Sequence, residues 1–274
     1  MTLVKNIHAA VVRTETLPFR IEIASEAQMP GVLQLRAASY AKHLPEMGVK
    51  LQKPEEADFR KGCENLVATS KLDGTVLGTL RTHANVMDPL PLQMSVKLPR
   101  LFRSRRMVES TRLCIKGNPG SSLVRTALFK AFHQYCLDQQ ADYMLATGRK
   151  PVDRIYDSLL FRDVGQPQHF FPMTFTGGIP HRVMYLAPEQ VQTLWTAGQH
   201  ALTEFFFERK HPDIDLSRAR SLASEVWLCP ETASVPSTLT LPEAAGTPLP
   251  VIRTREEHIR NTWPREDSNL APLT

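Results

Sequence analysis

The chain has 274 residues and a net charge of +5, and 42% of its residues are hydrophobic. This composition allows a substantial buried core over most of the chain. No apolar run approaches the ~20 residues that span a bilayer, and the first 19 residues lack the apolar stretch of a signal peptide. We therefore exclude a secretory signal and a membrane anchor, and we expect a cytoplasmic protein.

The sequence contains no recognisable metal-binding pattern. Its four cysteines are far apart and form no CxxC pair, and its nine histidines show no metal-ligand spacing. Isolated cysteines suit free thiols in a reducing compartment. No metal site is therefore predicted.

Positive charge is concentrated between Ser95 and Arg106, a segment without any acidic residue. Its basic residues are Lys97, Arg100, Arg103, Arg105 and Arg106. Such a segment attracts an acidic partner: nucleic acid, an anionic membrane or an acidic protein. The alternative is a solvated loop without a partner.

Hydrophobic periodicity predicts strands and helices along most of the chain. In chain order the expected elements are strand 19–23, helix 25–44, hairpin strands 65–69 and 75–80, a short helix at 98–102, strand 108–115, helix 123–136, strand 143–146, helix 152–161, strand 182–186 and helix 191–209. The hairpin is the clearest local signal, because Asp73-Gly74 supplies the positive φ that a tight turn needs. A capping-box pattern of Ser25 with Gln28 opens the first helix.

These elements predict one mixed α/β domain over residues 17–210, with a central, twisted mixed sheet flanked by helices. Residues 1–16 are expected to form an N-terminal arm. Residues 211–274 are expected to form a C-terminal extension that is helical in part. Beyond Trp227 this extension becomes rich in Pro, Ser, Thr and Ala, so we expect residues 229–274 to be mostly extended or disordered.

The motif Glu109-x-x-Arg112 on the expected central strand resembles a known family of enzymes. It is similar to the motif of the autoinducer synthases, which make acyl-homoserine lactones, and of the related N-acyl amino acid synthases. Further matching segments occur in the expected order: Arg36 with Tyr40, 54–58, 73–81 and 155–165. One departure is Leu160, which stands where a glycine is usual. The resemblance covers residues 19–210 and implies an acyltransferase with the GNAT-like fold.

The resemblance implies an acyl thioester donor, normally an acyl carrier protein, and an amine acceptor, with no tightly bound cofactor. The glycines of segment 116–122 would let backbone N–H groups approach a phosphate at a helix N-terminus. The full pyrophosphate loop of coenzyme A enzymes is missing there, which favours an acyl-phosphopantetheine on the carrier protein over acyl-CoA. The other interpretation of the segment is an ordinary strand-to-helix turn.

Carrier proteins of this kind are acidic, so the basic segment 97–106 gains a role as their docking site. Nucleic acid is not expected, because no recognisable binding motif is present and few aromatic residues are interleaved with the basic ones.

The resemblance makes Glu109 the candidate general base that removes a proton from the acceptor amine. Its other possible role is that of a structural acid. Three positions along a strand place Glu109 and Arg112 on opposite faces, so they need not pair directly. Arg112 is expected to anchor the loop around Asp58 or to orient Glu109. Tyr156 is the candidate acid for the leaving thiolate, or else a tyrosine that packs its hydroxyl at the surface.

Several further residues are expected to bind substrate. Backbone N–H groups around Leu113, Cys114 and Ile115 are candidates for the oxyanion hole. Arg81 suits the carboxylate of an amino acid, or else forms a structural salt bridge with Asp58 or Glu55. Asp58 belongs to the acidic loop of the family, and the Cys114 side chain is expected in the core. An acyl chain would lie along Leu128, Phe132 and Met144.

The leading hypothesis is therefore transfer of a fatty acyl group from an acyl carrier protein to the α-amine of an amino acid. A second is an acyl-homoserine-lactone synthase using S-adenosylmethionine, although the absence of tryptophan before Trp195 argues against it. Two more hypotheses are a coenzyme A-dependent N-acetyltransferase and a non-catalytic binding protein on the same scaffold.

Overall fold

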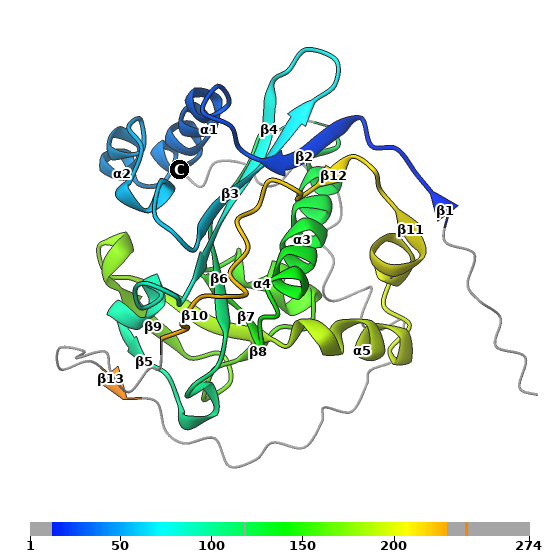
Figure 1. The fold of residues 1–274 in the computed structure, drawn as a ribbon. Helices are drawn as coiled ribbons and strands as arrows, with labels where there is room; N and C mark the ends of the chain where they lie inside the picture. The colour runs from blue at the N-terminus through cyan, green and yellow to red at the C-terminus, as the bar shows by residue number, and fades with distance from the viewer. Residues whose placement is uncertain (1–12, 118, 229–238, 241–274) are drawn as a thin grey trace, which may run out of the picture.

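The computed structural model describes residues 13–117, 119–228 and 239–240, and it is built around one mixed sheet (Figure 1). The strand order is β12-β2-β3-β4-β6-β7-β10-β8, and β9 pairs with β10. The strands are β1 (Arg13–Thr14), β2 (Phe19–Ile23), β3 (Cys63–Ser70), β4 (Val76–Ala84), β5 (Val96–Lys97), β6 (Met107–Ile115), β7 (Tyr143–Gly148), β8 (Arg162–Asp163), β9 (Phe170–Met173), β10 (Ile179–Leu186), β11 (Arg209–Lys210), β12 (Ile214–Asp215) and β13 (Leu239–Thr240). The predicted mixed α/β architecture is confirmed.

Helices lie on both faces of the sheet (Figure 1). The α-helices are α1 (Met29–Ala41), α2 (Pro45–Lys50), α3 (Ser121–Asp138), α4 (Asp153–Ser158) and α5 (Val191–Ala197). The shorter helical turns are η1 (Glu56–Asp58), η2 (Pro91–Met94), η3 (Arg100–Phe102), η4 (Thr174–Thr176), η5 (Pro188–Gln190) and η6 (Glu204–Glu208). Within the described residues, none of these helices combines the length and apolar character needed to cross a bilayer.

The hairpin predicted around Asp73-Gly74 is present as β3 and β4. Gly74 has a φ of +73°, and the Asp73 carboxylate accepts the Thr75 N–H at 3.0 Å. Both features are local, which is why the sequence reveals them. The two strands that the turn joins extend into the centre of the sheet, where β4 pairs with β6.

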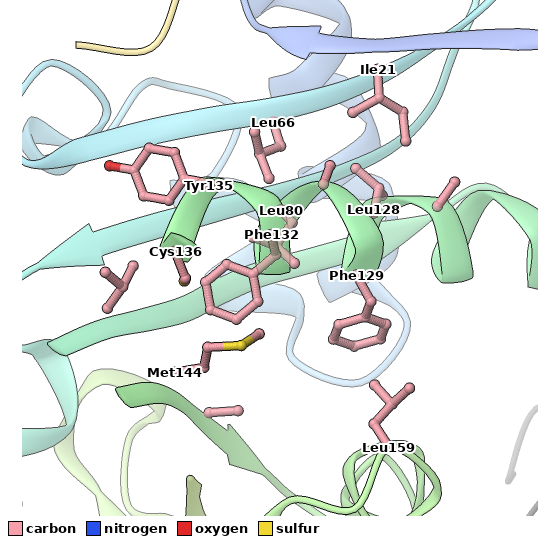
Figure 2. Packing of buried hydrophobic residues seen from close by; sticks show 14 of the residues in the cluster. Ile21, Leu66, Leu80, Leu128, Phe129, Phe132, Tyr135, Cys136, Met144 and Leu159 are labelled. Carbon is pink, nitrogen blue, oxygen red and sulfur yellow. The ribbon is translucent and has the colours of Figure 1, made fainter. Parts of the chain in front are cut away.

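Helix α3 forms the main core with the sheet (Figure 2). Its Leu128 and Phe132 are fully buried, and they belong to the same apolar cluster as Leu66, Leu80 and Met144. The expectation that Leu128, Phe132 and Met144 line an acyl cleft is therefore wrong. An apolar helix face has the same sequence pattern whether it meets a core or a ligand, and here it meets the core.

The sheet opens beside β6. The parallel ladder between β6 and β7 joins residues 107–110 to residues 143–146, and it includes no later residue of β6. Strand β6 is also bulged, because Arg112 has a φ of +53° and the register with β4 shifts between Thr79 and Arg81. A splayed, bulged strand leaves backbone groups and side chains available for a ligand.

Some elements differ from the sequence-based expectation. The predicted helix over 191–209 ends at Ala197, because Gln199 adopts a left-handed φ of +48° after Gly198. The extension was expected to be helical in part, but residues 211–228 contain no helix, and β12 pairs with β2 there. Residues 13–14 are paired with β11. Most of the segment 229–274 lies outside the described residues.

Candidate active site

Two cavities meet at the splayed part of β6. The first has a volume of about 180 Å³ and lies between β6, β7, α1 and α4, with Tyr40, Ser110, Cys114 and Tyr156 in its wall. The second has a volume of about 270 Å³ and is lined by residues that include Glu55, Arg81, His83 and Met94. Three residues line both cavities: Thr111, Arg112 and Phe175. We call the first cavity the donor cleft and the second the acceptor cavity.

A buried arginine network forms the floor beside the acceptor cavity. Arg36 on α1 and Arg81 on β4 both contact the Asp58 carboxylate, at 2.7 and 3.1 Å. Arg81 also reaches Glu55 at 2.9 Å, and Arg112 holds Glu55 with two bonds of 2.8 and 2.6 Å. The network thus fixes the loop that leads into η1 to strands β4 and β6.

The charges of this network do not balance. Three arginines face two carboxylates, which leaves one positive charge in excess while the buried Glu109 beneath them keeps its proton. Burial acts to raise the pKa of Asp58, but Arg36 and Arg81 hold it below its ordinary value. The Glu55 pKa is likewise lowered by Arg112 and Arg81 in spite of burial. Both acids therefore remain ionised, and the excess charge provides a place for one more anion.

The bulge at Arg112 overturns one expectation. Three positions along a regular strand would place Arg112 and Glu109 on opposite faces. The left-handed φ of Arg112 turns its side chain to Glu55, the carboxylate that also binds Arg81. Arg81 pairs with Thr111 in the register of β4 and β6, on the face that carries Glu109. Arg112 and Glu109 therefore lie on the same side of the sheet, contrary to the expectation for a regular strand. The expectation that Arg112 anchors the acidic loop agrees with its bonds to Glu55.

Glu109 is fully buried beneath this network and lines neither cavity. One carboxylate oxygen accepts the Leu92 N–H at 3.0 Å, and the other, Oε1, is buried with no partner. Burial raises the Glu109 pKa to about 8, although the Leu92 N–H and the arginines Arg81 and Arg112 act to lower it. A carboxyl group with this pKa exchanges its proton near neutral pH.

His83 lines the acceptor cavity, and sequence reasoning missed it. His83 pairs with Glu109 in the β4–β6 register. Its Nε2 accepts the Arg81 Nε–H at 3.0 Å and lies 3.0 Å from the Thr111 hydroxyl, while Nδ1 lies 3.2 Å from the Cys63 sulfur. Burial and the nearby arginines lower the His83 pKa well below its ordinary value, so the ring is neutral. Because Arg81 can only donate, Nε2 carries the lone pair, and the Thr111 hydroxyl is the donor in their contact.

The remaining expected site residues divide between the donor cleft and the core. Tyr156 is buried and lines the donor cleft, so the alternative of a surface tyrosine is wrong. Burial raises its pKa to about 12, and its hydroxyl contacts Ser110. Leu113 and Cys114 line the donor cleft, whereas Ile115 packs against the core beside Gly78.

The basic segment lies close to the acceptor cavity but does not line it. It follows η2, whose Met94 lines that cavity, and Ser95 is bonded to Thr174 at 2.9 Å. Arg105 lies 3.4 Å from Asp142, and Arg106 donates to Gln140 at 2.8 Å. Lys97, Arg100 and Arg103 are exposed.

No group of His, Cys, Asp and Glu side chains that could hold a metal ion occurs in the described part of the chain.

The model of the family N-acyl amino acid synthase FeeM matches residues 32–175. This span is more than half of the chain. It contains the arginine network and the three residues that line both cavities, Thr111, Arg112 and Phe175. The chain belongs to this family and is an N-acyltransferase.

Several solved structures are similar to this chain. FeeM, an N-acyl amino acid synthase from uncultured soil microbes, is 15% identical over 68% of this chain and 95% of its own, with a TM-score of 0.48. The coenzyme A-dependent acyl-homoserine lactone synthase BjaI is 12% identical over 70% of this chain and 93% of its own, with a TM-score of 0.48. A GNAT-family acetyltransferase from Staphylococcus aureus Mu50 is 10% identical over 62% of this chain and 99% of its own, with a TM-score of 0.44. No curated protein matches the chain.

Proposed function

We propose that the protein transfers a fatty acyl group from an acyl carrier protein thioester to the α-amine of an amino acid. The family supports N-acyl transfer, and the two adjoining cavities suit two substrates that must meet. The thioester would enter the donor cleft between β6 and β7. The amino acid would occupy the acceptor cavity, with its amine at the seam formed by Thr111, Arg112 and Phe175.

The observation that carries this proposal is the excess positive charge beside the acceptor cavity. An α-amino acid brings one carboxylate, which would balance the three arginines and two acids of the network. Arg81 and Arg112 line the cavity, and a guanidinium group binds a carboxylate with directed hydrogen bonds. An amine without a carboxylate would leave the charge unbalanced.

Glu109 is the proposed acceptor of the proton that the amine must lose. A free amine attacks the thioester carbonyl, whereas an ammonium group cannot, and a base with a pKa near the working pH is the most effective. Glu109 has such a pKa but lines neither cavity. The proton would therefore reach Glu109 through water.

The donor cleft contains groups that suit the rest of the reaction. The backbone of β6 beyond Ser110 is not paired with β7, so its N–H groups around Leu113 and Cys114 are candidates to bind the oxyanion of the tetrahedral intermediate. Tyr156 keeps its proton at neutral pH, so its hydroxyl could donate to the departing thiolate.

An acyl carrier protein is the proposed donor because a basic surface segment lies next to the site. Lys97, Arg100 and Arg103 are exposed, and Ser95 ties the segment to the turn that carries Phe175. An acidic carrier docked there would present its phosphopantetheine arm near the seam. The absence of the usual pyrophosphate loop from segment 116–122 also favours a donor with a single phosphate.

The test is an assay of purified protein with acyl carrier protein thioesters of several chain lengths and a panel of amino acids. Thiol release is followed together with the mass of the product, and acyl-CoA replaces the carrier thioester in parallel reactions. We expect N-acyl amino acid from the carrier donor. Lactone formed from S-adenosylmethionine, efficient transfer from acyl-CoA alone, or no product with any pair would contradict the proposal.

A further inference from the structure

Phe175 lies where the two cavities meet. It is the only apolar residue among the three that line both, since the others are Thr111 and Arg112. Its side chain is half-buried and packs on a second apolar cluster, which is separate from the core under α3 and includes Leu92, Phe171 and Val183. Its ring centroid lies 5.9 Å from that of His181. The ring therefore fills space between the donor cleft and the acceptor cavity rather than at the outer surface.

The short turn around Phe175 is held in place on both sides. Before it, the Thr174 N–H donates to Ser95 at 2.9 Å. After it, the Gly178 N–H donates to the Met173 carbonyl at 2.8 Å. Gly177 and Gly178 have φ values of +72° and +90°, which glycine adopts without strain, so the tight reversal itself imposes no cost on the ring position.

We propose that Phe175 is the partition between the two substrates, and that it determines which amines reach the thioester and keeps water away from it. This inference rests on the proposed function. Water and an amine are competing nucleophiles for the same thioester carbonyl. Attack by the amine gives an amide and a thiol, whereas attack by water gives a free fatty acid and a thiol.

The partition favours the amine over water because the arginine network would hold the carboxylate of the same amino acid. An amino acid whose carboxylate is held by Arg81 and Arg112 can present its nitrogen beside Phe175, whereas water has no such anchor. A smaller side chain at this position would join the two cavities. Water would then reach the carbonyl, and amines with larger substituents would fit.

The ratio of thiol released to amide formed tests this inference, because both reactions release one thiol but only one yields the amide. In the wild type we expect a ratio near one. Phe175→Ala should raise the ratio, and it should increase the preference for bulky over small amino acids by about tenfold. Phe175→Leu should shift both quantities in the same direction by less, and it serves in place of Phe175→Ala if the alanine variant does not fold.

The matched control is Phe171→Leu. Phe171 lies on β9 in the same segment and is buried in the same apolar cluster, but it lines neither cavity. Phe171→Leu should lower the thermal stability of the protein and leave the ratio of thiol to amide near one. An unchanged ratio and acceptor preference in folded Phe175 variants would overturn this inference alone. A wild type that releases no thiol with any donor would overturn the proposed function, and this inference with it.

Discussion

Arg182 and the network of Arg36, Arg81 and Arg112 are two buried arginine sites with opposite charge balance. Arg182 on β10 faces three carboxylates: Asp157 and Asp163 at 2.8 Å and Asp153 at 3.3 Å. It joins β10 to α4 and β8 and lines neither cavity of the site. In the second site arginines outnumber acids, and two of them line a cavity. The comparison teaches that a buried arginine indicates anion binding only where its own acids do not already satisfy it.

The largest expected effect separates the two sites by stability. Arg182→Met would leave three partly buried carboxylates facing one another, which should cost about 3–5 kcal/mol of the free energy of unfolding. Arg81→Met would leave two arginines with two carboxylates, so its cost should be clearly smaller, about 1–2 kcal/mol. Urea denaturation of both variants measures the difference. Equal losses would remove the basis for the charge-balance argument.

Glu109→Gln should lower kcat by about 100-fold, because a buried general base would be lost while the shape of the site is kept. The wild-type rate should also rise with pH through an inflection near 8, the pKa to which burial raises Glu109. The variant should lack that inflection. A pH–rate profile of both proteins measures this effect, and identical profiles would show that Glu109 takes no part in proton transfer.

Glu109 should also make the stability of the protein dependent on pH. The folded protein keeps a proton on Glu109 up to a pH of about 8, whereas the unfolded chain releases it above its ordinary pKa of 4.5. The free energy of unfolding should therefore fall between these two pH values, by at most about 1.4 kcal/mol per pH unit from this group. Denaturation of Glu109→Gln at pH 5 and pH 8 should show a flatter dependence than the wild type. A parallel dependence in the two proteins would mean that Glu109 ionises normally.

The smallest effect is expected at the exposed basic segment. The double variant Arg100→Glu, Arg103→Glu should raise KM for the acyl carrier protein severalfold, by about 1 kcal/mol in free energy, and weaken its salt dependence. The KM of the amino acid should stay unchanged. The double variant Arg20→Glu, Arg218→Glu is the matched control, because it changes two exposed arginines outside this segment and alters the net charge by the same amount. An equal effect of the control would assign the change to net charge rather than to docking.

Much of the fold could be predicted from local signals. The hairpin follows from Asp73-Gly74 and helix α3 from the spacing of its apolar residues, and both are present. Tertiary pairing decided the features that were missed. The bulge depends on a left-handed φ at Arg112, which the residue type at that position does not indicate.

The site was partly visible in the sequence. The motif around Glu109 and Arg112 indicated β6, a strand that borders both cavities, and the expected link between the acidic loop and Arg81 and Arg112 is present. His83 could have been found from its position two residues after Arg81, since alternate residues of a strand share a face. Phe175 could not, because its place at the seam depends on how β10 pairs with β7 and β9.

The central claim, that the acceptor is held by its carboxylate, is tested most directly by a pair of amines. Wild-type protein is given one carrier-bound acyl thioester with an amino acid, and then with the same amino acid lacking its α-carboxylate. The account predicts that kcat/KM falls by at least about 100-fold without the carboxylate, since a charged hydrogen-bonded contact of about 3 kcal/mol is lost. It also predicts that Arg81→Met, if folded, discriminates far less between the two amines. Equal rates for the two amines with the wild type would contradict it.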